Sequence, residues 1–268
     1  PSLRDAIFFQ FYSAITMVNR LIPCLLLRNN GLVKTKQFGQ TKYVGDPINA
    51  LRIFNDKAVD ELIVLDIQVG KERKEPNYEL IGQFAGECFM PLAYGGGITS
   101  VDQARRIFAL GVEKICVQTA ALQDLDFVAK LAQQFGNQSV VVVADIKKNW
   151  LGKYKLLASS TSKTIDLPWQ KFLEQAALAG AGELVVQAVD RDGLRCGLDL
   201  ALIKEAATLT QVPLIAMGGL SGLNDFSAAI QAGANAVAGG AFFVFQGPHE
   251  AVLITYPNYI DIKAALNY

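Results

Sequence analysis

The sequence predicts a (β/α)8 TIM barrel built from two similar halves. Residues 91–121, PLAYGGGITSVDQARRIFALGVEKICVQTAA, show an apolar strand, a glycine turn, an amphipathic helix and a second apolar strand. A related segment, PLIAMGGLSGLNDFSAAIQAGANAVAGGAFF, begins 122 positions later at Pro213, and Gly233 stands at the same offset from Gly111. Two such units at half the chain length, with strands and helices alternating over about 250 residues, favour a closed parallel barrel.

Length and composition agree with a single barrel domain, which we predict over residues 17–268. The chain has 268 residues, of which 51% are hydrophobic and 19% charged, so it can bury one large core. Residues 1–16 contain the apolar cluster IFFQFY, without the basic region and cleavage pattern typical of a signal peptide. We interpret them as an N-terminal extension, with a short docking helix as the alternative.

Charge and cysteine usage exclude several classes of function. Lys+Arg and Asp+Glu both number 25, so no nucleic-acid or membrane partner is predicted, and no run approaches the about 20 apolar residues that span a bilayer. Cys24, Cys88, Cys116 and Cys196 lack paired spacing, which favours reduced thiols in the cytoplasm and argues against zinc. We expect no metal and no cofactor. His249, the only histidine, is predicted to open a terminal helix at the surface, which disfavours a Ser-His-Asp triad.

Eight apolar segments alternate with helical patterns along the chain. The expected strands are 20–26, 61–67, 91–94, 114–118, 139–145, 183–189, 213–217 and 234–238. The expected helices are 47–55, 77–87, 101–110, 125–135, 168–179, 200–209, 223–232 and a last one after His249. Long loops at 28–46 and 147–167 follow the first and fifth strands. They are candidate substrate lids, because barrel active sites lie at the C-terminal ends of strands.

Acidic residues end three of the predicted strands. They are Asp66, Asp145 and the pair Asp190 and Asp192. A carboxylate leaving an apolar strand at the catalytic face can act as a general acid or base, because partial desolvation raises its pKa. The alternative is that each one caps a helix or binds loop amides.

Glycine turns follow the third and seventh strands, at 95–97 and 218–219, and residues 118–119 and 239–241 follow the fourth and eighth. Such turns leave backbone N–H groups free near helix N-termini, an arrangement that binds phosphate. Tight packing of strand against helix also demands glycine. The symmetric pair predicts two opposed phosphate pockets that suit a long ligand with a phosphate at each end.

Four charged residues stand at or beside the starts of predicted strands: Arg20, Glu61, Lys114 and Glu183. Two charges of each sign could neutralise one another in a ring that constricts the base of the barrel. Spacing alone favours the simpler interpretation that each charge is separately solvated.

Several segments carry a resemblance to a known family: IPCLLLRNNGLVKT, GDPINA, DELIVLDI, YGGGI, GVEKICVQTAA, VVVADIKK, GAGELVVQAVDRDG and the closing GG turns. In this order they resemble HisF, the cyclase subunit of imidazole glycerol phosphate synthase, from Met17 to about Pro257. The resemblance implies a (β/α)8 barrel that receives ammonia from a HisH-like glutaminase docked on its N-terminal face. It also implies, against the interpretation from spacing, that Arg20, Glu61, Lys114 and Glu183 form the ammonia gate.

The resemblance also assigns two phosphate sites. One site contains Gly97, Gln118 and Thr119, with Gln118 in place of the usual Asn. The other contains Asp192, Gly193, Gly219, Gly240 and Ala241, with Ala241 in place of the usual Ser.

The catalytic positions of the family are only half present. Asp145 matches one of two catalytic aspartates, whereas Leu26 occupies the place of the other, and an alkyl group cannot transfer protons. Lys34 and Lys147 remain near the expected mouth but restore no carboxylate. The LLL sequence, with VFQG followed by AVLITYP, resembles a HisF-like branch associated with sugar amidation in surface polysaccharide (O-antigen type) synthesis. In that branch the barrel works with a HisH-like glutaminase and a separate ATP-dependent sugar amidotransferase.

We therefore expect a cytoplasmic HisF-like subunit that takes ammonia from a glutaminase and delivers it for amidation of a sugar. Its substrate would be a small phosphorylated or sugar molecule. The alternatives are genuine imidazole glycerol phosphate synthesis in histidine biosynthesis and a non-catalytic module that activates the glutaminase.

Overall fold

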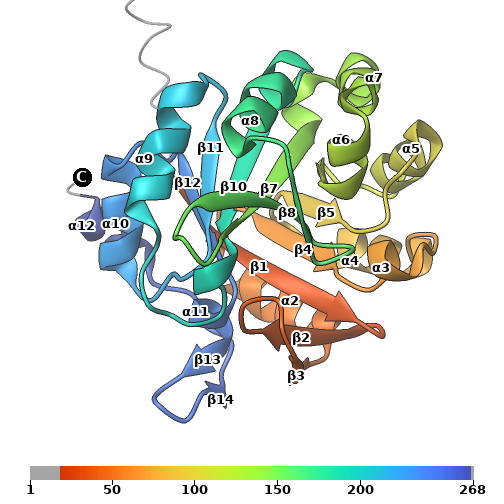
Figure 1. Cartoon of the computed structure of the whole chain (residues 1–268). Helices are drawn as coiled ribbons and strands as arrows, with labels where there is room; N and C mark the ends of the chain where they lie inside the picture. Colours follow the sequence, from red (N-terminus) through yellow and green to blue (C-terminus); the bar gives the residue numbers. More distant parts are fainter. Residues whose placement is uncertain (1–18, 267–268) are drawn as a thin grey trace, which may run out of the picture.

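Eight parallel strands close into a barrel with helices on its outside (Figure 1). The computed structural model describes residues 19–266. The strands follow one another around the barrel as β1 (Arg20–Arg28), β4 (Leu62–Asp66), β5 (Leu92–Gly95), β6 (Lys114–Val117), β7 (Val140–Lys148), β10 (Glu183–Ala188), β11 (Leu214–Met217) and β12 (Ala236–Gly239). Pairing of β1 with β12 and of β7 with β10 completes the circle. The predicted fold class is confirmed.

The longer helices cover the barrel from outside, and several of them begin at a residue whose side chain caps the helix. They are α2 (Pro47–Asp56), α4 (Tyr78–Glu87), α5 (Val101–Ala109), α7 (Leu125–Phe135), α8 (Trp169–Leu178), α9 (Leu200–Leu209), α10 (Leu223–Gln231) and α12 (Tyr259–Ala265). Asp46 caps α2, and Ser100 with Gln103 forms a capping box on α5. Three short helices sit at the strand ends: α3 (Val69–Glu72), α6 (Thr119–Gln123) and α11 (Ala241–Val244).

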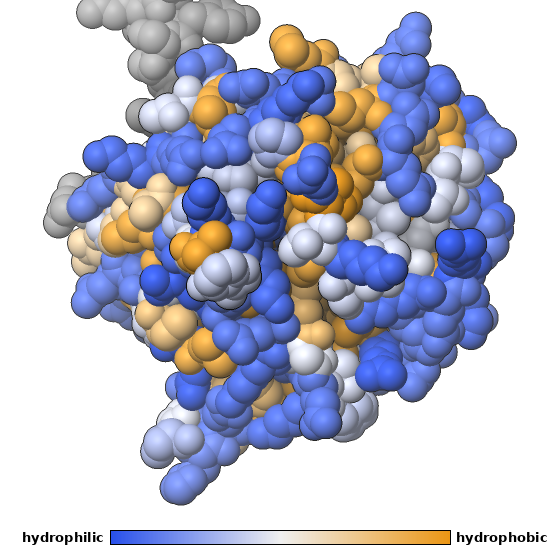
Figure 2. All heavy atoms as spheres, in the orientation of Figure 1, coloured by the Kyte–Doolittle hydropathy of each residue, from blue (hydrophilic) through white to orange (hydrophobic). Residues whose placement is uncertain are grey.

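The hydrophobic core has two layers because alternate residues of each strand face opposite sides. Along β1, Ile22, Cys24 and Leu26 point into the barrel, whereas Leu21 and Leu25 pack against the helices. Both sides of the strands are covered, which explains why they are apolar throughout. Polar residues cover most of the face in Figure 2, and hydrophobic residues reach that surface along a band through its middle.

The two long loops expected at 28–46 and 147–167 are largely β-structure, so that expectation was wrong. They contain β2 (Gly31–Thr35), β3 (Thr41–Gly45), β8 (Tyr154–Ala158) and β9 (Lys163–Ile165). β1 and β7 run on past the barrel rim and pair antiparallel with β2 and β8. Asn29 and Asn30 both have positive φ, 50° and 61°, as in the tight turns that join hairpin strands.

The expected position of His249 at the start of the last helix was also wrong. His249 lies in the turn between β13 (Phe245–Gln246) and β14 (Ala251–Val252), and α12 begins ten residues later. Gly247, with a φ of 70°, and Pro248 favour this turn over a helix. The N-terminal extension expected at 1–16 lies outside the described residues. Within residues 19–266, no helix combines the length and apolar character that crossing a membrane requires.

Candidate active site

A pocket of about 330 Å³ opens at the C-terminal ends of the barrel strands. The lower part of its wall is apolar, with Leu26, Leu65, Cys116, Val143 and Met217 closing the top of the barrel interior. Its walls come from residues that follow the strands, as expected for this fold. We call it the main pocket.

Asp145, on the inward face of β7, is the most strongly perturbed acid of the main pocket. It is 3% exposed, and its Oδ2 accepts a hydrogen bond from Gln118 Nε2 at 3.1 Å, whereas Oδ1 has no partner. Burial raises the pKa of Asp145 to about 7; the Ser159 hydroxyl opposes this shift, and the negative charge of Asp192 adds to it. Near neutral pH the side chain can therefore donate or accept a proton at Oδ1.

The residues predicted for the first phosphate site meet in one wall of the main pocket. Gly97, Gln118 and Thr119 all line it. Gly97 has a φ of 68°, and a Cβ there would lie 2.3 Å from Val69 Cγ1, so only glycine fits. The amide of Gln118 is already engaged, because Nε2 also donates to Leu157 O at 2.6 Å and Oε1 accepts from Thr119 Oγ1 at 3.1 Å.

The residues predicted for the second phosphate site also converge. A small hollow beside the main pocket is lined by Asp192, Gly193, Gly219, Gly240 and Ala241. Its volume of about 10 Å³ leaves room for one water-sized group. A Cβ on Gly219, whose φ is 104°, would lie 2.2 Å from Gly197 O, so the turn brings backbone against backbone. All five residues lie together, and their role in binding phosphate stays a prediction.

Leu26 occupies the end of β1 and lines the main pocket, half-buried. It pairs with Leu65 of β4 and Val33 of β2, so its neighbours in the sheet are also apolar. Four acidic residues line the main pocket, but none comes from β1: they are Asp66, Glu72, Asp145 and Asp192. The structure therefore places an isobutyl group in the wall where the family resemblance requires a carboxylate.

Lys34 is a pocket residue that the sequence analysis left outside its predicted site. It enters from β2, is 6% exposed, and donates from Nζ to Cys24 O at 2.6 Å. Burial lowers its pKa, although the nearby Cys24 and Asp192 oppose this shift. A Cβ on Gly240 would lie 1.9 Å from this amine, so Gly240 leaves the space that Lys34 fills. Lys147, in contrast, is exposed and does not line the main pocket.

Two of the predicted acids accept hydrogen bonds from backbone amides. This was the alternative to a catalytic role for carboxylates at strand ends. Asp66 Oδ1 accepts from the N–H groups of Gln68 and Val69 at 2.9 and 3.2 Å, and Asp66 still borders the main pocket. Asp190 Oδ2 accepts from Lys148 N at 2.6 Å and does not line it. Other pocket residues were missed because their segments were taken for loops: Thr35, Ser159 and Ser160.

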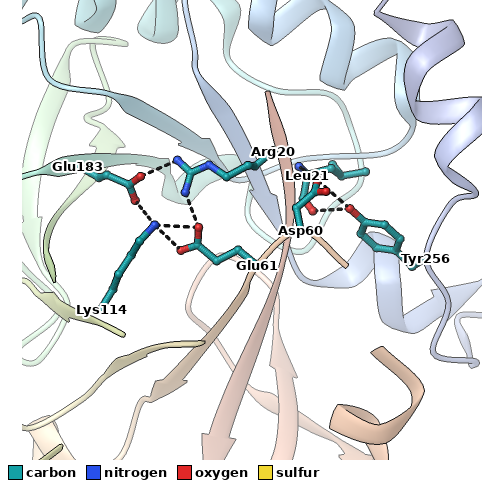
Figure 3. A network of polar contacts seen from close by, with 7 residues as sticks. All are labelled: Arg20, Leu21, Asp60, Glu61, Lys114, Glu183 and Tyr256. Atoms are coloured by element: carbon teal, nitrogen blue, oxygen red, sulfur yellow. Dashed lines mark hydrogen bonds and ion pairs between the residues drawn. The ribbon is translucent and has the colours of Figure 1, made fainter. Parts of the chain in front are cut away.

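At the opposite end of the barrel, four side chains form one charged ring (Figure 3). Arg20 contacts Glu61, and its Nη2 lies 2.6 Å from Glu183 Oε1. Lys114 Nζ lies 2.9 Å from Glu61 Oε2 and 3.1 Å from Glu183 Oε2. The interpretation of separately solvated charges was therefore wrong, because the strand starts converge at the barrel base.

Charges in this ring compensate one another in a largely buried setting. Glu61 is only 2% exposed. Burial alone would lower the pKa of Arg20, but the carboxylates of Glu183 and Glu61 outweigh it and raise that pKa. The ring closes the end of the barrel interior that lies opposite the main pocket. Across residues 19–266, no group of three His, Cys, Asp or Glu residues is arranged to hold a metal ion.

Comparison with known proteins supplies the family. The sequence profile described as "Histidine biosynthesis protein" matches residues 20–248. The chain is 48% identical to the "Putative imidazole glycerol phosphate synthase subunit hisF2" of Pseudomonas aeruginosa, over 91% of this chain and 98% of that protein. It is 45% identical to a protein of Leptospira interrogans named "Putative imidazole glycerol phosphate synthase subunit HisF", over 93% and 98%. The chain therefore belongs to the histidine biosynthesis protein family and, within it, to the HisF-like subunits of imidazole glycerol phosphate synthase.

Proposed function

We propose that this protein takes ammonia from a HisH-like glutaminase at its charged ring and delivers it for the amidation of a sugar, without the cyclase reaction of HisF. The observation that carries the proposal is Leu26, an apolar side chain in the pocket wall where the family resemblance requires a catalytic aspartate. The cyclisation step of the cyclase reaction needs one group to remove a proton and another to supply one. Asp145 alone provides half of that pair.

The barrel interior suits passage of neutral ammonia between the ring and the main pocket. Its side chains are apolar from Ile22 and Val185 near the ring to Leu26 and Leu65 below the pocket. An ammonium ion would pay a large desolvation penalty in such surroundings, whereas ammonia carries no charge. In the proposal Arg20, Glu61, Lys114 and Glu183 act as the gate, because their ion pairs close the base until one contact opens.

Gly97 places a glycine turn in the main pocket, which has room for an anionic group, whereas the hollow beside it holds only a water-sized group. This supports a phosphorylated sugar or a nucleotide sugar as the molecule bound at the mouth. An ATP-dependent sugar amidotransferase docked at that mouth would consume the ammonia. All four cysteines are free thiols, which supports our placement of the reaction in the cytoplasm.

Genuine cyclase activity in histidine biosynthesis is the second candidate, and Asp145 favours it. A buried aspartate with a pKa of about 7 and one unpaired oxygen is suited to proton transfer. This candidate requires that the cyclisation step proceed without a carboxylate on β1.

The cyclase assay separates the two candidates. We expect the purified chain, supplied with ammonium salt and the histidine-pathway intermediate, to form no imidazole glycerol phosphate and to rescue no strain that lacks the histidine cyclase. Turnover near one per second, within the ordinary enzyme range of roughly 1 to 10³ per second, would overturn the proposal. Leu26→Asp should restore some turnover, and Leu26→Asn, of similar size but without a carboxylate, should not.

A bypass experiment tests delivery directly. With glutamine as nitrogen donor, amidation of the sugar by the ATP-dependent enzyme should require both this chain and the glutaminase. Excess ammonium chloride at alkaline pH should remove both requirements, because free ammonia then reaches the acceptor through solution. If the chain is still needed under excess ammonia, it takes part in the chemistry and is more than a conduit.

A further inference from the structure

The segment AVLITYP, residues 251–257, begins with β14 and has no role in the proposed reaction. It runs beside α11, with Leu253 N donating to Val244 O at 2.8 Å and Thr255 N donating to Phe243 O at 2.9 Å. Tyr256 is buried and stacks on Phe243 with ring centroids 5.6 Å apart. These contacts fix the position of the Tyr256 ring against the barrel wall.

The hydroxyl of Tyr256 reaches two strand starts at once (Figure 3). It lies 2.8 Å from Leu21 O and 3.2 Å from Asp60 Oδ2. The same Asp60 oxygen accepts a hydrogen bond from Leu21 N at 2.9 Å. Burial raises the pKa of Tyr256, and the charge of Asp60 adds to this, so the hydroxyl keeps its proton and donates it to one of the two acceptors.

These contacts join residues that are direct neighbours of the charged ring. Leu21 follows Arg20 on β1, and Asp60 precedes Glu61. The ladder between β1 and β4 begins only at Cys24 and Ile63. The start of β1 therefore has no backbone pairing with β4, and the contacts of Asp60 and Tyr256 link the two strand starts instead.

We propose that Tyr256 and Asp60 are positioning residues that hold Arg20 against Glu61 and so set the spacing of the charged ring. Its relevance to ammonia rests on the proposed function. Loss of the hydroxyl leaves the hydrogen bond from Leu21 N to Asp60 Oδ2 as the last of these three contacts. Leu21 still pairs with Val237 of β12, so the start of β1 stays in the sheet but is held less firmly against β4. Arg20 moves with it, and because Arg20 bridges Glu61 and Glu183, the ring opens on that side.

Side-chain NMR of the arginine guanidinium tests the proposal in Tyr256→Phe, with the Arg20 signal assigned by its absence in Arg20→Lys. Tyr154→Phe is the matched control, because Tyr154 also donates from its hydroxyl to a carboxylate, Asp199 Oδ1, at 2.9 Å, and does so on β8 beyond the opposite rim of the barrel. In Tyr256→Phe we expect the Arg20 signal to shift and the guanidinium protons of Arg20 to exchange with water about tenfold faster. A change of this size follows from losing one ordinary hydrogen bond. The control variant should show neither change.

An unchanged Arg20 signal in Tyr256→Phe, or the same change in both variants, would overturn the proposal. Asp60→Asn provides a second route should Tyr256→Phe fold poorly, since it removes the charged acceptor at nearly constant size. It should give a change in the same direction, and an unaltered Arg20 signal there would equally contradict the role of the pair.

A parallel measurement distinguishes failure of this inference from failure of the proposed function. In a complex with the glutaminase and the sugar amidotransferase, free ammonia and glutamate are quantified together. A higher ratio of free ammonia to glutamate in Tyr256→Phe shows a leaking gate. An altered Arg20 signal without any leak leaves the positioning role standing and removes the ammonia gate from the proposed function.

Discussion

Asp145 shows how one buried side chain acquires chemistry from its position. Asp145 lies on an apolar strand and lines the main pocket together with Val143, Cys116 and Leu26; one of its oxygens is held by Gln118 and the other is unpaired. The replacement of the family's Asn by Gln118 matters here. The amide bridges Asp145 to the carbonyl of Leu157, so β6 and the β7–β8 hairpin together orient the acid.

The difference in unfolding free energy between Asp145→Asn and the unmutated chain should favour the variant more at pH 8 than at pH 4. The folded pKa of about 7 exceeds the unfolded value of 3.8, so the folded state holds a proton that the unfolded state has lost between these values. Stability therefore falls as pH rises through this window, and asparagine escapes that loss. The relative gain should be on the order of a few kcal/mol, at about 1.4 kcal/mol for each pKa unit.

Urea unfolding of both proteins at the two pH values provides the measurement. Asp56→Asn, at an exposed position of α2, controls for the change in net charge. A stability difference between Asp145→Asn and the unmutated chain that is the same at pH 4 and pH 8 would show that the buried acid does not titrate in this range.

At the scale of elements, the sequence predicted those parts of the fold that depend on local patterns. The eight barrel strands and the longer helices follow from apolar periodicity and caps such as Asp46 and Ser100. The hairpins β2–β3 and β8–β9 were missed because their strands are short and carry lysines that suggested a loop. In the fold those strands are stabilised by pairing with extensions of β1 and β7, which no local pattern reveals.

Pocket residues contributed by those hairpins were missed for the same reason, except Lys34, which was expected near the mouth but given no site. Lys34 on β2 and Ser159 in the turn between β8 and β9 come to the main pocket only because these hairpins fold back over the rim. Thr35 likewise places its Oγ1 3.3 Å from Asp192 Oδ2. In contrast, the glycine turns were predicted correctly, since their backbone geometry is a property of the turn itself.

Gly219→Ala should destabilise the protein strongly, whereas Gly86→Ala should stabilise it slightly. At Gly219 the φ of 104° and the 2.2 Å approach of a Cβ to Gly197 O impose strain and a backbone clash. The expected loss is about 3 kcal/mol or more. Gly86 is exposed on α4 and has nothing within 4 Å of a Cβ, so alanine should add about 0.5–1 kcal/mol of stability.

Thermal unfolding of the two variants checks this pair of opposite signs. Equal and small effects would show that the turn between β11 and α10 adjusts freely, and the small hollow that this turn borders would then not be rigid. A loss of stability in Gly86→Ala would mean that another molecule or segment contacts α4 at this position.

For the whole molecule, the charged ring exists only because the barrel closes. Its members are separated by up to 163 positions along the chain, between Arg20 and Glu183. Spacing along the sequence therefore favoured separate solvated charges, and only the family resemblance pointed to a ring. The same closure places the apolar interior between the ring and the main pocket, so one architecture connects the two ends of the molecule.

Lys114→Met should weaken the fold and uncouple glutamine hydrolysis from ammonia delivery. Removing this ammonium group leaves Glu61 and Glu183 with Arg20 as their remaining partner in the ring, and breaking a largely buried ion pair commonly costs about 3–5 kcal/mol. Repulsion between the two carboxylates should also widen the ring. In the complex with the glutaminase, we expect glutamate formation to continue while ammonia escapes before reaching the sugar acceptor.

The measurement compares glutamate, free ammonia and amidated sugar in one reaction. Lys130→Met, which removes an exposed lysine on α7, controls for the change in net charge and should alter neither stability nor coupling. Raising the salt concentration should disturb the ring little, because screening acts mainly on exposed charges. Full coupling in Lys114→Met, with stability lowered as expected, would mean that the ring supports the barrel base and that ammonia enters the protein by another route.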